Sequence, residues 1–162
     1  MTNTVKGTVI RSTGNWNTVL LEDELVCECN LRGRFRIKGL RTTNPVTVGD
    51  NVEIIKDEAN PKVGVIVNIL PRKNYVIRKS VNLSKEAHII ASNLDQAIVI
   101  ATVEQPRTSF GFIDRVLCTT EAYKIPSAVV INKSDIYTSK ESKELLKTYI
   151  ETYERIGYRT FV

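Results

Sequence analysis

Long hydrophobic runs are missing from this sequence. A membrane-spanning helix needs roughly 18 consecutive apolar residues, and no stretch of the 162 residues approaches that length. The first residues, MTNTVKGTVIRS, also lack the apolar core of a secretory signal. Hydrophobic residues make up 42% and charged residues 25%, which are values typical of globular proteins. We therefore expect a soluble, cytoplasmic and monomeric protein with no membrane partner.

Cysteine and histidine are scarce. Three cysteines without framework spacing argue against a secreted disulfide scaffold, and His88 is the only histidine. Cys27 and Cys29 alternate around Glu28 in a strand-like stretch, so both should point to one face, while Cys118 lies far off in sequence. We interpret the cysteines as buried structural thiols, with a metal or redox role as the alternative, and we assign no metal site.

A phosphate-binding loop is missing as well. P-loop hydrolases hold nucleotide phosphates with the backbone amides of Gly-x-x-x-x-Gly-Lys-Ser/Thr, and none of the eight glycines begins such a sequence. No Asp-x-x-Gly switch sequence occurs either. Because phosphoryl transfer depends on holding the phosphates and on Mg²⁺, we expect this chain alone to be inactive in hydrolysis, and we assign no catalytic residue.

Positive charge is concentrated in two stretches. The net charge is +5, and residues 73–85 contribute four basic side chains and no acidic ones. The first basic stretch, residues 31–41, holds Arg32, Arg34, Arg36, Lys38 and Arg41; the second, residues 72–85, includes Lys73, Arg78 and Lys79. Such patches are typical of contacts with nucleic-acid phosphates, although a solvated basic surface is the alternative.

Residues 1–71 show short β-type runs separated by turn residues. The predicted strands are Val5–Ser12, Thr18–Leu21, Val26–Leu31, Asn51–Lys56 and Gly64–Ile69. Five short strands in about 70 residues indicate a small β-barrel, with the OB-fold as the leading candidate and an SH3-like barrel as the alternative. Trp16 lies in the first turn, where it could stack on a base or plug the end of the barrel. Residues 72–95 are polar and basic, which predicts a linker or a loop that orders on binding.

Residues 96–162 follow an alternating strand and helix pattern. We predict strands at Gln96–Val103, Ser127–Ile131 and Tyr158–Val162, and helices at Phe112–Tyr123 and Thr138–Ile156. The second helix should begin with a Thr138-x-x-Glu141 capping box and end at Gly157. This order predicts a parallel α/β sheet. With three strands and no covering element on the last edge, we expect an incomplete α/β domain.

Asn132-Lys133-Ser134-Asp135 is a guanine-recognition sequence directly after the second predicted strand of that region. Guanine presents two donors on one edge, N1–H and the exocyclic amine, and the Asp135 carboxylate could accept both. Adenine would leave that carboxylate unpaired, which explains the choice of base. The stem of Lys133 would lie over the base plane, Asn132 would tie neighbouring loops together, and Ser134 is the tolerant position. A solvated turn that caps the next helix is the alternative interpretation.

The position of this sequence indicates a permuted domain. In an ordinary GTPase the phosphate loop precedes the base-reading sequence by roughly a hundred residues. Here the α/β region reaches Asn132 after one strand and one helix, without a phosphate loop before it. This order predicts a circularly permuted P-loop GTPase domain whose phosphate loop lies after Val162.

The layout resembles the ribosome small subunit-dependent GTPase A family. The segments that carry the resemblance are Ser12–Trp16, Val48–Val52, Leu70–Asn74, Ala91–Gln96, Phe112–Arg115 and Asn132–Asp135. The resemblance implies an OB domain, a permuted GTPase domain that binds GTP or GDP with Mg²⁺, and a zinc-binding domain whose ligands lie outside this chain. It also implies a role in late assembly of the small (30S) ribosomal subunit and contact with its rRNA. A non-enzymatic RNA-binding OB module joined to an α/β domain that binds no nucleotide is the alternative.

Overall fold

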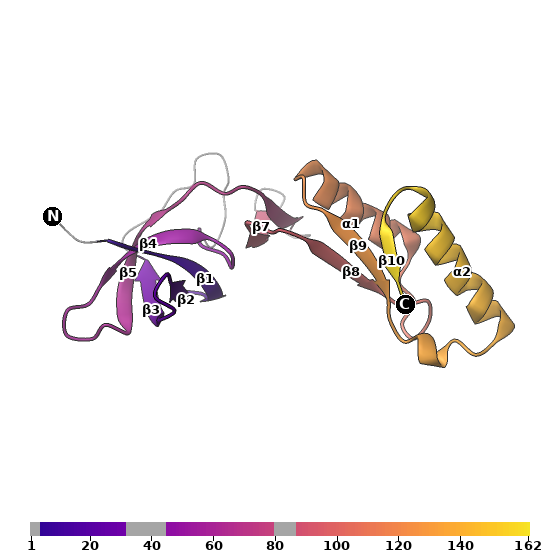
Figure 1. Ribbon diagram of the computed structural model, residues 1–162, viewed down its shortest axis with the longest axis horizontal. Helices are drawn as coiled ribbons and strands as arrows, with labels where there is room; N and C mark the ends of the chain where they lie inside the picture. The colour runs from indigo at the N-terminus through magenta and orange to yellow at the C-terminus, as the bar shows by residue number, and fades with distance from the viewer. Residues whose placement is uncertain (1–3, 32–44, 80–86) are drawn as a thin grey trace. The chain divides into compact units, whose positions relative to one another are not determined.

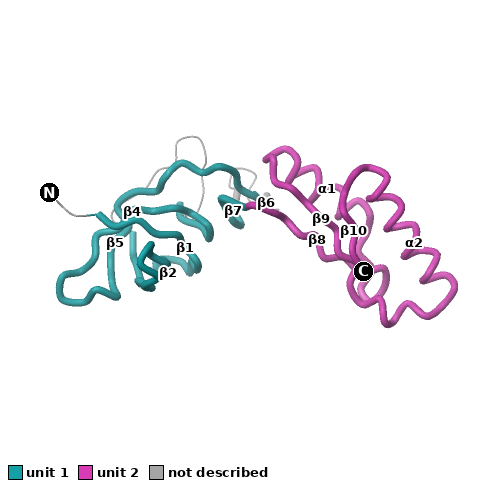
Figure 2. Tube along the Cα trace, in the orientation of Figure 1, with its two compact units in different colours: residues 1–94 teal, residues 95–162 magenta. Residues whose placement is uncertain are grey.

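The chain folds into two compact units, residues 1–94 and 95–162 (Figures 1 and 2). The computed structural model describes residues 4–31, 45–79 and 87–162. Within those ranges, no helix is both long enough and apolar enough to cross a bilayer.

The first unit contains a closed five-stranded barrel, as expected. Its strands follow the order β1-β2-β3-β5-β4, and β4 pairs with β1 to close the barrel. β3 and β5 run parallel, while the other neighbouring pairs are antiparallel. This is the OB-fold arrangement. The strands are β1 (Val5–Thr13), β2 (Trp16–Leu21), β3 (Val26–Leu31), β4 (Asn51–Lys56) and β5 (Val63–Ile69).

Alternation of side chains fills the barrel interior. Inward residues such as Val9, Val19 and Ile66 are almost fully buried, because successive side chains of a strand point to opposite faces. Gly7 allows a close approach between β1 and β2: a Cβ atom there would lie 2.6 Å from Cγ1 of Val19. A β-bulge between Val9 and Arg11 shifts the register of this pair, and such bulges increase local bending and twist.

Two of the cysteines lie inside the barrel. Cys27 and Cys29 are fully buried, as predicted. Burial raises the pKa of the Cys29 thiol well above its usual range, and hydrogen bonding to Cys27 adds to the effect. The prediction of a buried thiol is wrong for Cys118, which lies on an exposed face of a helix in the second unit.

The segment predicted as a linker contains two strands. β6 (Tyr75–Lys79) and β7 (Ala87–Ser92) pair antiparallel, and the first compact unit extends to Leu94. Neighbouring β-branched residues, Val76-Ile77 on one strand and Ile89-Ile90 on the other, favour this extended conformation. The polar and basic residues around these pairs led to the prediction of a linker in place of two strands.

A buried ion pair joins this hairpin to the barrel. Asp50 is fully buried, and its carboxylate accepts two hydrogen bonds from Arg72, at 2.6 Å from Nε and 2.7 Å from Nη2. It also accepts hydrogen bonds from the Ser92 hydroxyl, at 2.6 Å, and from the backbone N–H of Thr47, at 2.9 Å. Arg72 Nη2 donates to the carbonyl of Pro45 as well, at 2.9 Å. One carboxylate therefore holds three chain segments together.

The backbone is tightly packed around this ion pair. Gly49 has φ +88°, and a Cβ atom there would lie only 2.0 Å from the Ser92 carbonyl oxygen, so no larger residue fits. The Asn93 side chain donates to the Gly49 carbonyl at 2.8 Å. The Asn74 side chain donates to the carbonyl of Leu94 and accepts from its N–H, at 2.8 and 2.7 Å. The last residues of the first unit are thus hydrogen-bonded directly to the barrel and the hairpin.

The second unit is a three-stranded parallel sheet with two helices, which confirms the predicted α/β class. The strand order is β10-β9-β8. Both helices share one apolar core with the sheet, so they cover the same face (Figure 1). On the other face, Ile98 and Ile100 are 58% and 64% exposed. The elements are β8 (Ala97–Ala101), α1 (Phe110–Ala122), β9 (Ser127–Ile131), a short 3₁₀ turn η1 (Ser134–Ile136), α2 (Lys140–Arg155) and β10 (Arg159–Phe161).

The ends of α2 differ in part from the prediction. Ser139 is the N-cap, and its hydroxyl accepts a hydrogen bond from the Ser142 N–H, so the predicted cap at Thr138 is wrong by one residue. Both residue types can cap a helix, and the sequence alone does not discriminate between neighbours. Gly157 follows the helix with φ +93°, as expected for a helix-terminating glycine.

Replacing Asp50 tests the ion pair. We expect Asp50→Ala to lower the free energy of unfolding by about 3–5 kcal/mol, because Arg72 would remain charged and buried without its partner. Asp23→Ala is the matched control, since it removes the partly exposed Asp23–Lys56 pair at 3.5 Å and should cost less than about 1 kcal/mol. Urea unfolding followed by Trp16 fluorescence measures both. Equal costs would contradict a structural role for the buried pair.

Thiol accessibility provides a second test of the fold. In the native protein an alkylating reagent should modify Cys118 and leave Cys27 and Cys29 unmodified, because the latter are buried and the thiolate of Cys29 is disfavoured. All three should react in denaturant. Mass spectrometry of the labelled peptides identifies each site, and native labelling of Cys27 or Cys29 would show that the barrel opens readily.

Candidate guanine site

The predicted base-reading sequence lies where two parallel strands end. β8 and β9 run parallel in register, so their carboxyl ends share one edge of the sheet. Asn132 follows β9 directly, and its N–H donates to the carbonyl of Ala101, the last residue of β8, at 2.8 Å. Ligands of open α/β sheets bind outside this edge. The side chains from Asn132 to Asp135 are exposed there.

The backbone conformation of the sequence is unusual at Lys133. Its φ is +63°, in the left-handed region that non-glycine residues rarely adopt. Asn132 Oδ1 accepts a hydrogen bond from the Lys133 N–H at 2.8 Å, a local contact that stabilises such turns. The following 3₁₀ turn is closed by the Ile136 N–H, which donates to the Lys133 carbonyl at 3.2 Å. The Asp135 side chain is thus presented on a short, hydrogen-bonded turn.

A second loop, residues 102–109 between β8 and α1, lies against this sequence. The Lys133 ammonium donates to the carbonyl of Gln105 at 2.6 Å. The hydroxyl of Tyr149 on α2 donates to the carbonyl of Thr108 at 2.5 Å, and the Ser142 hydroxyl donates to Glu104 at 2.8 Å. Sequence reasoning did not identify this loop. Its place at the carboxyl end of β8, on the same edge as Asn132, was the signal that could have found it.

Asp135 is available to a ligand. Its side chain is exposed, and the described residues make no hydrogen bond or ion pair to its carboxylate. A carboxylate with four lone-pair sites accepts two neighbouring donors well. This arrangement fits the N1–H and exocyclic amine of guanine, which lie side by side on one edge of the base.

The predicted RNA-contacting residues are placed only in part. Trp16 begins β2, opposite Asn30 and Thr13, and its side chain is 49% exposed. Lys73 is exposed, and its backbone N–H donates to Asn93 Oδ1 at 2.8 Å. Arg78 and Lys79 belong to β6. The first basic stretch lies outside the described residues, and with it Arg32, Arg34, Arg36, Lys38 and Arg41.

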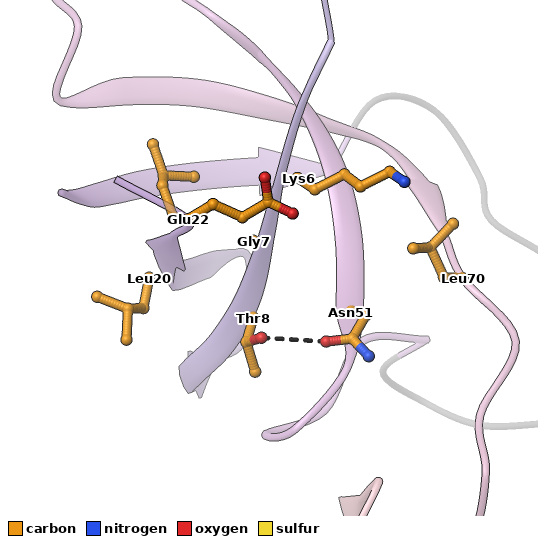
Figure 3. Close-up of a pocket in the computed structure, with 8 residues that line it drawn as sticks. Lys6, Gly7, Thr8, Leu20, Glu22, Asn51 and Leu70 are labelled. Atoms are coloured by element: carbon orange, nitrogen blue, oxygen red, sulfur yellow. Dashed lines mark hydrogen bonds between the residues drawn. The ribbon is translucent and has the colours of Figure 1, made fainter. Parts of the chain in front are cut away.

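A hollow on the barrel surface has different chemistry (Figure 3). Its volume is about 390 Å³. Thr8 Oγ1 donates to Asn51 Oδ1 across it at 3.0 Å, and its lining contains one cation, Lys6, and one anion, Glu22. Charges of opposite sign and a mixed polar and apolar lining single out no ligand. The Asn132–Asp135 edge, which belongs to the other unit, therefore remains the candidate site.

Metal ligands are not gathered in the described residues. Across residues 4–31, 45–79 and 87–162, no three His, Cys, Asp or Glu side chains are arranged to hold a metal ion. We therefore assign none of these residues to the Mg²⁺ or zinc that the family resemblance implies.

Comparisons with known proteins assign both units to one family. The family model described as RsgA N-terminal domain matches residues 6–66, and the one described as RsgA GTPase matches residues 69–162. The chain is 46% identical over 157 residues to the small ribosomal subunit biogenesis GTPase RsgA of Bacteroides fragilis, covering 97% of this chain and 50% of that protein. It is 48% identical over 155 residues to the protein of the same name from Christiangramia forsetii, covering 95% and 49%.

Solved structures agree with these matches. The crystal structure of YloQ, described as a circularly permuted GTPase, superposes with a TM-score of 0.68 at 28% identity, covering 98% of this chain and 51% of that one. YjeQ from Thermotoga maritima gives a TM-score of 0.68 at 32% identity, with the same coverage. The chain spans about half the length of the curated relatives it matches. It belongs to the RsgA family, and its fold is that of a circularly permuted GTPase joined to an OB-type barrel.

Proposed function

We propose that the full-length protein is a GTPase that supports late assembly of the small ribosomal subunit. Membership of the RsgA family and the names of its relatives support this role. The single observation that carries the nucleotide part is the position of Asn132–Asp135 at the carboxyl edge of β8 and β9. A protein with this task works in the cytoplasm, where the ribosomal subunits are. No observation favours a non-enzymatic RNA-binding module.

Guanine would be recognised by the side chains of that edge. The Asp135 carboxylate accepts from N1–H and from the exocyclic amine, which excludes adenine. The Lys133 stem covers the base, and its ammonium stays anchored on the Gln105 carbonyl. Asn132 fixes the turn through its own side chain, and the Ser134 carbonyl accepts a hydrogen bond from the Tyr137 N–H.

Hydrolysis would require groups from elsewhere in the full-length protein. The sequence holds no phosphate loop and no switch sequence, and Asn132–Asp135 would supply only base selection. Bound Mg²⁺ would supply charge neutralisation at the phosphates. We therefore propose that this chain alone does not hydrolyse GTP.

Ribosomal RNA would be contacted by the barrel unit. OB-folds bind nucleic acid on the face of strands 2 and 3 and the adjoining loops, and the exposed Trp16 begins β2. The first basic stretch directly follows β3. Arginines in such a stretch bind phosphates with an affinity that falls as salt rises. The second basic stretch, including Lys73, Arg78 and Lys79, would extend this surface.

Replacing Asp135 tests base recognition in the full-length protein. We expect Asp135→Asn to weaken GTP binding by at least about tenfold, because the carboxylate's two hydrogen bonds to guanine are lost. Preference should shift toward xanthosine triphosphate, since the amide can donate to the additional carbonyl of xanthine. Titration calorimetry with both nucleotides measures the change.

Glu144→Gln is the control for this measurement. It removes one negative charge from an exposed position on α2 of the same unit and should leave both affinities unchanged. Wild-type GTP affinity in Asp135→Asn would remove Asp135 from the site.

Charge reversal tests the first basic stretch. The double variant Arg34→Glu/Arg36→Glu should co-sediment less with small ribosomal subunits, and the deficit should be largest at low salt. Lys62→Glu/Lys124→Glu changes the net charge equally at two exposed lysines outside both stretches. If the two double variants lose binding to the same extent, only total charge matters and the proposed RNA contact is wrong.

A further inference from the structure

The hydroxyl of Tyr137 lies between the base-reading sequence and the end of β8. Tyr137 follows η1 and is only 3% exposed. Its hydroxyl donates to the Asn132 carbonyl at 2.5 Å and accepts from the Val103 N–H at 2.9 Å. A phenol has one hydrogen to donate and lone pairs to accept with, so this single group bridges the two loops that form the candidate site.

The peptide group between Asn132 and Lys133 is hydrogen-bonded at both its carbonyl and its N–H. The Asn132 carbonyl and the Lys133 N–H belong to the same planar unit. Tyr137 binds the carbonyl from one side, and the Asn132 side chain binds the N–H from the other, at 2.8 Å. The orientation of this plane is therefore fixed immediately before Lys133, whose φ of +63° turns the chain.

The direction of Asp135 depends on that peptide group. Two residues separate it from the fixed plane, and those residues enter a 3₁₀ turn closed by hydrogen bonds from the N–H groups of Ile136 and Tyr137. Tyr137 therefore holds the turn at both of its ends, through its backbone and through its hydroxyl. A carboxylate that must meet two donors on one base edge needs a defined direction, since hydrogen bonds weaken steeply as their angles deteriorate.

We propose that Tyr137 is a positioning residue for guanine recognition, which acts by fixing the Asn132–Lys133 peptide group so that the Asp135 carboxylate faces both guanine donors. This inference rests on the proposed guanine site. Tyr137 does not contact the base. Its hydroxyl fixes the direction from which the Asp135 carboxylate meets the base. The same hydroxyl accepts a hydrogen bond from the Val103 N–H, which links the 102–109 loop to the turn.

Inosine diphosphate distinguishes positioning from general stability. Hypoxanthine keeps N1–H and lacks the exocyclic amine, so the ratio of the IDP and GDP dissociation constants reports how well the carboxylate meets the second donor. In the full-length protein Tyr137→Phe should weaken GDP binding by about tenfold, and the IDP to GDP ratio should fall toward one, because a misdirected carboxylate gains less from the amine.

Tyr153→Phe is the matched control. Tyr153 is fully buried, and its hydroxyl lies 3.1 Å from Asp114 Oδ1 and 3.4 Å from the Phe110 carbonyl oxygen, so its one hydrogen is shared between these two acceptors. Neither acceptor belongs to the Asn132–Asp135 turn. This variant loses a buried hydroxyl of the same chemistry, so it should lower the melting temperature and leave the nucleotide ratio unchanged. Amide exchange provides a second measurement that needs no nucleotide: the Val103 N–H should exchange faster in Tyr137→Phe alone.

Three outcomes separate this inference from the proposal on which it rests. A lowered ratio in Tyr137→Phe and an unchanged ratio in Tyr153→Phe support the positioning role. If Asp135→Asn alters nucleotide preference while Tyr137→Phe keeps the wild-type ratio, Tyr137 is a structural residue only. If Asp135→Asn itself leaves the preference unchanged, the guanine site is wrong and the positioning role is overturned with it.

Discussion

The bidentate pair between Asp50 and Arg72 is the interaction on which the first unit depends. A buried carboxylate is costly unless its lone pairs are filled, and here an arginine, a serine hydroxyl and a backbone N–H fill them. Those donors come from the segment before β4, the segment after β5 and the end of β7. Because all three donors must reach the Asp50 carboxylate, the segments that carry Thr47, Arg72 and Ser92 are held together at this point.

The second unit relies on hydrogen bonds at the carboxyl edge of its sheet. Side chains from the segment after β9 and from α2 reach across to loop 102–109, through Lys133, Tyr137, Ser142 and Tyr149. Most of these bonds end on backbone carbonyls or N–H groups, which leaves exposed side chains such as Asp135 available to a ligand. Rigid support with a free carboxylate is the arrangement that selective base recognition needs.

Local patterns predicted most of the fold. Alternating apolar residues defined the five barrel strands, and the helical period of α2 located it to within two residues at its start and one at its end. The hairpin β6–β7 and the position of Ser139 as N-cap were not predicted, because pairing partners and single-residue boundaries depend on tertiary contacts. The proposal that Asn132–Asp135 reads the base came from residue types alone. The 102–109 loop and Tyr137 were not predicted, since their roles exist only once β8 and β9 lie side by side.

The close contact between Gly49 and Ser92 determines where the chain can be joined to a relative in a chimeric protein. The two family models meet between residues 66 and 69, whereas the compact units separate at residue 94. A chimera joined at the first boundary would keep Asp50 and Gly49 from one parent and take Arg72 and Ser92 from the other. Recombination between RsgA relatives should therefore succeed more readily near residue 94. A junction there keeps Asp50 with Arg72, and Gly49 with Ser92, in one parent.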